Sequence, residues 1–265
     1  GLGDVYKRQS TPLVLAAVGE LVVEKSGVLN LGVEGMMIIG AVTSFIVTYE
    51  TGSHFLGLIA AVISAGLVAS LFGLLTQYLL SNQVATGLAL TLFGLGLASL
   101  IGQTYSGISL DAFPVFDVYL LTEIPIIGSL LFNFDYLIYL SIIIVVSVYY
   151  FLNKTKLGLV LTAIGDSHDS AHSLGYSVKM VRLFAIIFGG SCAGLGGAYL
   201  SLVQTPMWVE NMTAGRGWIA LAIVVFAVWR PLWILVGAYI FGGITIIQLH
   251  VQALGVNIGA QYMSM

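Results

Sequence analysis

The sequence predicts an all-α protein, a polytopic bundle of transmembrane helices. The first observation is the composition, because 58% of the 265 residues are hydrophobic and only 8% are charged, with a mean hydropathy of +1.02. Soluble domains carry about 25% charged residues, so a soluble fold of this length could not bury so much apolar surface. The second observation is a series of apolar runs that approach about 20 residues, the length of a helix that crosses a membrane.

Eight segments are expected in the membrane: 11–24, 34–49, 54–80, 84–103, 136–152, 181–203, 217–229 and 231–248. The segment 217–229 is too short to cross alone, and short segments of this kind mark the broken helices that line cavities in transporters. Residues 1–9 are polar and lack the apolar core of a signal peptide, so we expect a non-native leader there. Residues 10–265 are then expected to form a single transmembrane domain.

Lysine and arginine predict the orientation of this domain, because they concentrate in cytoplasmic loops. The loop 153–182 is expected to be cytoplasmic, whereas the loop 104–135 contains acidic residues without lysine or arginine and is expected to be external. Counting spans outward places Lys25 and Arg230 on the cytoplasmic side and leaves Arg216 outside as the exception.

The polar loop 153–182 is predicted to contain a short helix that docks a soluble partner. Asp166 and Asp169 resemble a loose capping box, so a helix would run from about 167 to 174. Ala171 and Leu174 would share one of its faces, and Gly175 would end it.

Polar residues beside the apolar segments are the candidates for a translocation path. Asn30 and Glu34 are expected at the cytoplasmic mouth of the second segment, where Asn30 either caps the helix or contributes to the path. Glu210 and Arg216 are candidates for an ion pair in an external loop, or for a gate. The residues predicted to line the path or its gate are Asn30, Glu34, Gln83, Thr86, Gln204, Glu210, Asn211 and Arg216.

Several other chemistries have little support in the sequence. The chain has no GxxxxGK[ST] loop for ATP and no basic stripe for nucleic acid. His168 and His172 have a spacing that could bind a metal, but no third ligand is evident, so no metal or cofactor is expected. An intramembrane protease of the rhomboid type would need GxSG, which residues 107–110 lack. An ion-coupled carrier stays as an alternative, although Glu20, Glu24 and Glu34 are expected beside one membrane face rather than at the midplane.

Three stretches resemble a known family: GVLNLGVEGMMIIGA, AIGDSHDSAHSLGYSVKMVRLFAIIFGG and ENMTAGRGWIALAIVVFAVWRP. Together they are similar to the permease subunits of ABC importers of the ribose and branched-chain amino acid superfamily, and ENMTAGRGWIALA resembles the nucleoside branch, which is associated with basic membrane lipoproteins. The resemblance covers residues 11–265. The family loop reads Gly-Glu-Asn-Pro, whereas this chain has Gly165-Asp166-Ser167-His168, which leaves the start of the loop helix open.

The resemblance implies a type II-like permease in a bacterial cytoplasmic membrane, paired with a second permease. It also implies a cytoplasmic ATPase subunit, an external substrate-binding lipoprotein and surrounding membrane lipid as partners, with no enzymatic activity in this chain. The expected substrate is a small polar solute, a nucleoside first and a simple sugar as the alternative. The residues expected to couple to the ATPase are Gly165, Asp166, Asp169, Ala171, Leu174 and Gly175. The family extends beyond the last residue here, so a C-terminal helix is expected to be missing.

Overall fold

The computed structural model describes residues 2–116, 134–167 and 175–253, and nearly all of them are helical, which confirms the predicted all-α class. The helices are α1 (Leu2–Lys25), α2 (Val33–Thr51), α3 (His54–Gly73), α4 (Gln83–Gly102), α7 (Tyr136–Lys154), α8 (Lys156–Asp166), α10 (Val178–Tyr199), α11 (Arg216–Phe226) and α12 (Pro231–Ala253). Single turns extend three of them: the π-helical turns Leu74–Tyr78 and Leu200–Gln204, and the 3-10 turn Gln103–Tyr105. Two short antiparallel strands, β1 (Val115–Phe116) and β2 (Phe134–Asp135), precede α7.

Five helices are long and apolar enough to cross a membrane: Val33–Thr51, His54–Tyr78, Gln83–Tyr105, Tyr136–Lys154 and Val178–Gln204. They coincide with five of the eight expected segments. The segment 11–24 lies within α1, which also includes residues 2–9 of the expected leader. There the ring of Tyr6 stacks on Tyr239 of α12, with 5.9 Å between the ring centres. The segments 217–229 and 231–248 correspond to α11, which is only 11 residues long, and to α12.

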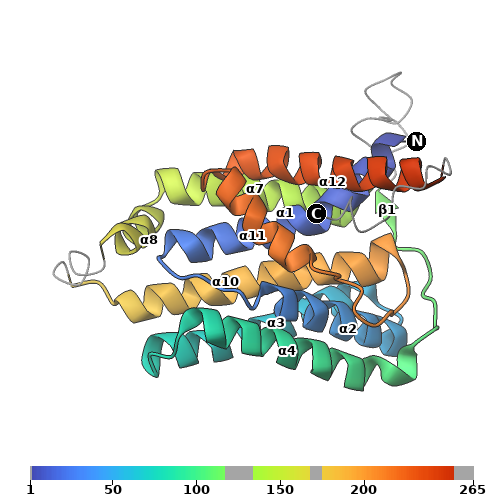
Figure 1. The fold of residues 1–265 in the computed structure, drawn as a ribbon, viewed down its shortest axis with the longest axis horizontal. Helices are drawn as coiled ribbons and strands as arrows, with labels where there is room; N and C mark the ends of the chain where they lie inside the picture. Colours follow the sequence, from blue (N-terminus) through green and yellow to red (C-terminus); the bar gives the residue numbers. More distant parts are fainter. Residues whose placement is uncertain (1, 117–133, 168–174, 254–265) are drawn as a thin grey trace.

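α10 forms the centre of the bundle, where it packs against α1, α2 and α3 (Figure 1). In both α2 and α10, 72% of the most apolar stretch is buried, against 28–33% for α3, α4 and α7. α1 is also internal, because its apolar residues from Leu13 to Val23 are buried. The outer helices therefore present apolar side chains to the membrane, whereas α1, α2 and α10 contact mainly protein.

Glycines allow the inner helices to approach each other closely. A Cβ atom added at Gly40 of α2 would lie 2.5 Å from the backbone of Gly194 in α10, and one added at Gly94 of α4 would lie 2.7 Å from Gly35. Side-chain atoms essentially never come this close to backbone. Small residues at helix crossings are typical of membrane bundles, in which van der Waals contact drives helix association.

Six of the nine lysine and arginine residues lie in or near helix ends at one end of the molecule, here called the basic end: Lys25, Lys154, Lys156, Lys179, Arg182 and Arg230. α8 and the start of α10 lie at this end (Figure 1). The side chain of Arg182 donates to the carbonyl of Ser26, 2.9 Å away, and Gly165 lies against the backbone of Lys25. This clustering agrees with the expected cytoplasmic orientation of the loop 153–182.

The described part of this loop contains a helix, α8, that was not predicted. Thr155 is the N-cap of α8, because its hydroxyl accepts from the backbone N–H of Gly158 at 3.1 Å. Asp166 is the last residue of α8, and the predicted helix from about 167 to 174 lies almost entirely outside the described residues. The apolar run from Leu157 to Ile164 favours α8. Three expected coupling residues, Asp169, Ala171 and Leu174, lie outside the described residues, as do His168 and His172; Gly175 has a left-handed φ of 83°.

We expect Gly40→Ala to lower the thermal stability of the bundle. The added methyl group must displace the backbone of Gly194, and overpacking of this kind costs about 1–3 kcal/mol. Gly96→Ala is the matched control, because a Cβ atom at this exposed position in α4 meets nothing within 4 Å. The melting temperature of each purified variant in detergent measures the effect, and equal melting temperatures for both variants would contradict the close crossing of α2 and α10.

Candidate functional site

Two irregular segments enter the bundle from opposite ends. The first, residues 26–32, begins at the basic end and runs inward beside α4. The backbone N–H of Leu29 donates to Gln83 at 2.9 Å, and Gly32 lies against Gly87, one turn deeper in α4. The backbone N–H of Asn30 donates to the carboxylate of Glu20 at 3.1 Å. Side chains of the neighbouring helices thus satisfy backbone groups that have no helical partner.

The second segment, residues 205–215, enters from the other end. Trp208 is buried against Gly102, at the end of α4. Further along, the hydroxyl of Ser99 donates to Glu210 at 2.8 Å, and Thr213 reaches Glu34. The segment therefore descends along α4 into the bundle, and α11 begins inside the protein rather than at its surface.

The two segments meet at the carboxylate of Glu34, in the first turn of α2. Its Oε1 atom accepts from the hydroxyl of Thr213 at 2.6 Å and from the backbone N–H of Gly215 at 2.8 Å. Its Oε2 atom accepts from the backbone N–H of Gly217 at 2.6 Å. Glu34 is only 2% exposed. These three donors satisfy a buried carboxylate that would otherwise be costly inside a membrane protein.

Glu34 serves the N-termini of two helices at once. It lies in the first turn of α2 and accepts from the first turn of α11, so it faces the positive ends of both helix dipoles. Glycine is required at both donor positions. Gly215 has a φ of 82°, and a Cβ atom at Gly217 would lie 2.6 Å from the backbone of Glu34. This junction, formed by Glu34, Thr213, Gly215 and Gly217, is called the Glu34 junction below.

The junction lies deep in the bundle, so the expected position of Asn30 and Glu34 at the cytoplasmic mouth is wrong. Met36, in the same turn as Glu34, lies against Gly190, near the middle of α10. Asn30 does not cap α2 either, because the N-cap is Gly32. Its Oδ1 atom instead accepts from the backbone N–H of Gly32 at 2.9 Å and shapes the turn before the helix. The prediction failed because residues 26–32 enter the bundle before α2 begins.

The expected pairing of Glu210 with Arg216 is also wrong. Glu210 accepts from Ser99, whereas Arg216 donates to the carbonyl of Met212 at 2.8 Å and interacts electrostatically with Glu34. Arg216 therefore lies inside the bundle at the start of α11, beside an acidic partner. The rule that basic residues concentrate in cytoplasmic loops does not apply to a residue inside the bundle, so Arg216 was the exception to it.

Two polar cavities flank the second segment. One, of about 440 Å³, is lined by Ser99, Gln103, Ser106 and Glu210, which carry both donors and acceptors. The other, of about 240 Å³, lies between the π-helical end of α10 and the start of α11.

The smaller cavity brings together Gln204 and Arg216, two of the predicted path residues. The amide nitrogen of Gln204 donates to Gln9 at 3.1 Å, while its Oε1 atom is buried without a hydrogen-bond partner. Asn211, with a left-handed φ of 57°, turns the chain between the two cavities.

Gln83 and Thr86 lie apart from these cavities, in the first turn of α4 at the basic end. Gln83 accepts from Leu29, as described above, and the hydroxyl of Thr86 is hydrogen-bonded to that of Ser81 at 2.8 Å. Their contacts are local: Gln83 supports the first segment, and Thr86 supports the turn before α4.

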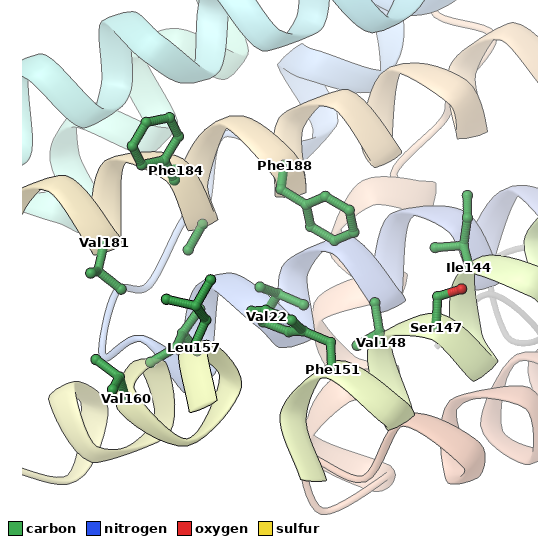
Figure 2. Close-up of a pocket in the computed structure, with 12 residues that line it drawn as sticks. Val22, Ile144, Ser147, Val148, Phe151, Leu157, Val160, Val181, Phe184 and Phe188 are labelled. Carbon is green, nitrogen blue, oxygen red and sulfur yellow. The ribbon is translucent and has the colours of Figure 1, made fainter. Parts of the chain in front are cut away.

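A third cavity, of about 450 Å³, is apolar and does not suit a polar solute (Figure 2). It lies among α1, α7, α8 and α10, and Ser147 is the only polar side chain among its twelve lining residues. Phe184 and Phe188 of α10 and Phe151 of α7 contribute aromatic rings to it. The polar cavities beside residues 205–215 are therefore the better candidates for a solute path.

Sequence reasoning missed the three donors to Glu34 and the burial of Glu20. Thr213, Gly215 and Gly217 alternate with Ala214 and Arg216 at the start of an apolar helix, a pattern that suits an anion-binding N-terminus. Glu20 is only 1% exposed, and its Oε2 atom has no hydrogen-bond partner. Within the described ranges, no cluster of three or more His, Cys, Asp or Glu side chains could hold a metal ion.

Comparison with known sequences gives a consistent result over almost the whole chain. The family model described as "Branched-chain amino acid transport system / permease component" matches residues 6–262. A putative glucose ABC transporter permease protein of Haloferax volcanii, TsgC13, is 42% identical over 96% of this chain and 78% of its own length. No solved structure matches the chain.

Two relatives carry names that refer to nucleosides. The nucleoside ABC transporter permease protein NupC of Lactococcus lactis and the guanosine ABC transporter permease protein NupQ of Bacillus subtilis are each 29% identical, over 88% of this chain and 77% of their own length. With the helical bundle and its span-length apolar helices, these matches show that the chain is an integral membrane protein of the branched-chain amino acid transport system permease family, an ABC transporter permease.

Proposed function

We propose that this permease forms half of the translocation path of an ATP-driven importer for a small solute rich in hydroxyl groups. The observation that carries the proposal is the Glu34 junction, where two segments from opposite ends of the bundle meet, the second of them flanked by polar cavities. Broken helices whose N-termini meet inside a bundle are a common way to build transport sites. Rearrangement of the second segment would alter the two cavities that flank it.

The importer requires three further subunits in this proposal. A cytoplasmic ATPase docks at the basic end, through Gly165, Asp166, Asp169, Ala171, Leu174 and Gly175. A second permease completes the path, and an external lipoprotein delivers the solute. This chain itself is not an enzyme, and its role is to convert movement of the ATPase into movement of the path.

A continuous line of contacts favours this coupling. Gly165, at the end of α8, lies against Gly27, so closely that a Cβ atom there would be 3.2 Å from the Gly27 nitrogen. Gly27 is the second residue of the first irregular segment, which leads through Asn30 to Glu34. A displacement of α8 by the ATPase would therefore shift the segment that ends at the Glu34 junction.

The proposed substrates share a sugar moiety. Ser99, Gln103, Ser106 and Glu210 supply the mixture of donors and acceptors that adjacent hydroxyl groups require. The 42% identity to a putative glucose permease favours a hexose, and the two relatives named for nucleosides and guanosine favour a nucleoside as the second candidate. Both carry the hydroxyl groups that this polar lining suits.

We expect vesicles that hold the complete complex to take up labelled glucose in an ATP-dependent manner. Uptake of labelled uridine and guanosine by the same vesicles tests the nucleoside candidate. Uptake of a nucleoside without glucose would replace the hexose assignment and leave the ATP-driven function intact. Uptake that is driven by an ion gradient and is independent of ATP would contradict the proposal of an ATP-driven importer.

Glu34→Gln is expected to weaken both folding and transport. The amide oxygen can still accept from two donors, but the amide nitrogen then faces the backbone N–H of Gly217, and an unsatisfied buried donor costs about 1–3 kcal/mol. Glu34→Leu leaves all three donors without an acceptor and is expected to be more harmful. Melting temperature and uptake by the reconstituted complex measure the two effects.

Glu50→Gln is the control for this series, because Glu50 is an exposed carboxylate on the same helix that accepts from Tyr105. We expect this variant to be near wild type in both measurements. If Glu34→Gln and Glu50→Gln behaved alike, the Glu34 junction would have no special role in the fold or in transport.

Leu174→Asp is expected to release the ATPase subunit without preventing membrane insertion. A charge placed in an apolar contact is costly when it is buried without a partner. Tyr176→Asp places the same charge two residues further on, beyond Gly175, and is expected to retain the subunit. Co-purification of the ATPase with each tagged permease variant gives the result, and retention by Leu174→Asp would contradict docking at this position.

A further inference from the structure

The structure contains a fourth cavity that the proposed transport function does not use. It has a volume of about 640 Å³ and lies at the basic end, between the α7–α8 elbow and the turn that joins α11 to α12. Its polar lining comes from Lys25, Asn153, Thr162 and Arg230.

Both cations in this cavity are available to a ligand. Within the described part of the chain, neither Lys25 nor Arg230 forms an ion pair, and no acidic residue lines the cavity. Glu24, the neighbour of Lys25 in sequence, accepts a hydrogen bond from the indole nitrogen of Trp229. Glu24 itself is not among the lining residues, so the lining carries two positive charges, with one carboxylate hydrogen-bonded to its wall.

The backbone around Arg230 is held in an uncommon conformation. Val228 and Trp229 have left-handed φ values of 48° and 51°, which β-branched and bulky residues rarely adopt. The turn brings Arg230 into the lining together with Pro231, at the N-terminus of α12. The positive end of this helix dipole adds to the attraction for an anion.

The remaining wall is apolar and aromatic. Tyr149 of α7, Leu159 of α8 and Trp233 of α12 line it, and all three are largely exposed, at 40%, 59% and 55%. Tyrosine and tryptophan are enriched where protein meets the membrane–water interface. A free inorganic anion would gain nothing from such a wall, whereas a ligand with a charged head and an apolar body would contact both parts.

We propose that this cavity binds the headgroup of an anionic phospholipid. The phosphate is held between Lys25 and Arg230, since a guanidinium can donate two parallel hydrogen bonds to phosphate oxygens. The acyl chains lie along the exposed apolar faces of α7 and α12, which include Val146 and Val236. Basic pockets between membrane helices on the cytoplasmic side suit such headgroups, and anionic lipids are abundant in that leaflet.

Native mass spectrometry of the purified permease tests this site. Detergent-solubilised protein is mixed with equal amounts of phosphatidylglycerol and phosphatidylcholine, and the lipid that stays bound is quantified. We expect preferential retention of phosphatidylglycerol, and at least a tenfold loss of that retention in the double variant Lys25→Gln, Arg230→Gln. Equal retention of the two lipids by the wild type would overturn the proposal.

Two further variants separate the cavity from general surface charge. Asn153→Trp keeps both cations but fills the cavity, and we expect the same loss of phosphatidylglycerol. Lys179→Gln removes a charge at the same end, where Lys179 lies over the ring of Tyr78 instead of in the cavity, and we expect no loss. A loss in Lys179→Gln equal to that of the double variant would show attraction by the whole surface and overturn the site.

Glycerol 3-phosphate distinguishes the lipid from a soluble anion with the same chemistry. We expect a large excess of it to leave phosphatidylglycerol bound, because it lacks acyl chains. Complete displacement would assign the cavity to a soluble phosphate compound and contradict the lipid proposal.

Discussion

The fold depends on the way in which the carboxylate of Glu34 satisfies three donors inside the bundle. Two irregular segments enter from opposite ends, and each brings backbone groups that have no partner within a helix. Inside a membrane protein such groups must be satisfied by other protein groups. Gln83 and Glu20 do this for the first segment. Glu34 does it where the second segment leads into α11, and so it fixes the start of α11 relative to the start of α2.

Close packing of the inner helices makes this arrangement possible. Gly40 against Gly194 brings α2 onto α10, and Gly35 against Gly94 brings α4 onto α2. With larger residues at these crossings, the helices would stand further apart, and the short distances around Glu34 could not be maintained. The glycines at 215 and 217 have a different role, because there the backbone itself is the ligand of the carboxylate.

The two ends of the bundle have different chemistry. At the basic end, α8 lies against the start of the segment 26–32, so a subunit that moves α8 would act on the Glu34 junction through Gly27. The polar cavities lie beside the other segment, 205–215. Glu34 is therefore placed between the part that would receive mechanical work and the part that would contact solute. The cavity proposed to bind lipid, at the basic end, borders α8 as well, through Leu159 and Thr162.

Much of the architecture followed from the sequence, because hydropathy and charge act locally. Runs of about 20 apolar residues are sufficient to indicate a membrane helix, and five expected segments are span-length helices. The same reasoning recognised that 217–229 was too short to cross. Asn30, Glu34 and Arg216 were singled out because polar groups near apolar helices require a partner. The stretches around Asn30 and Glu210 were also sufficient to identify the resemblance to the permease family from sequence alone.

Only the tertiary structure decided which partner each of these groups has. Local sequence placed Glu34 at a membrane surface and paired Glu210 with Arg216, since nothing in the sequence shows that residues 26–32 and 205–215 turn inward. That depends on contacts between residues almost 180 positions apart, such as Glu34 with Thr213. Helix α8 in the loop 153–182 was missed for a similar reason, because its end packs through Gly165 against Lys25 and Gly27, which are distant in sequence. A sequence determines which groups need a hydrogen bond, whereas the fold determines which donor is near enough to supply it.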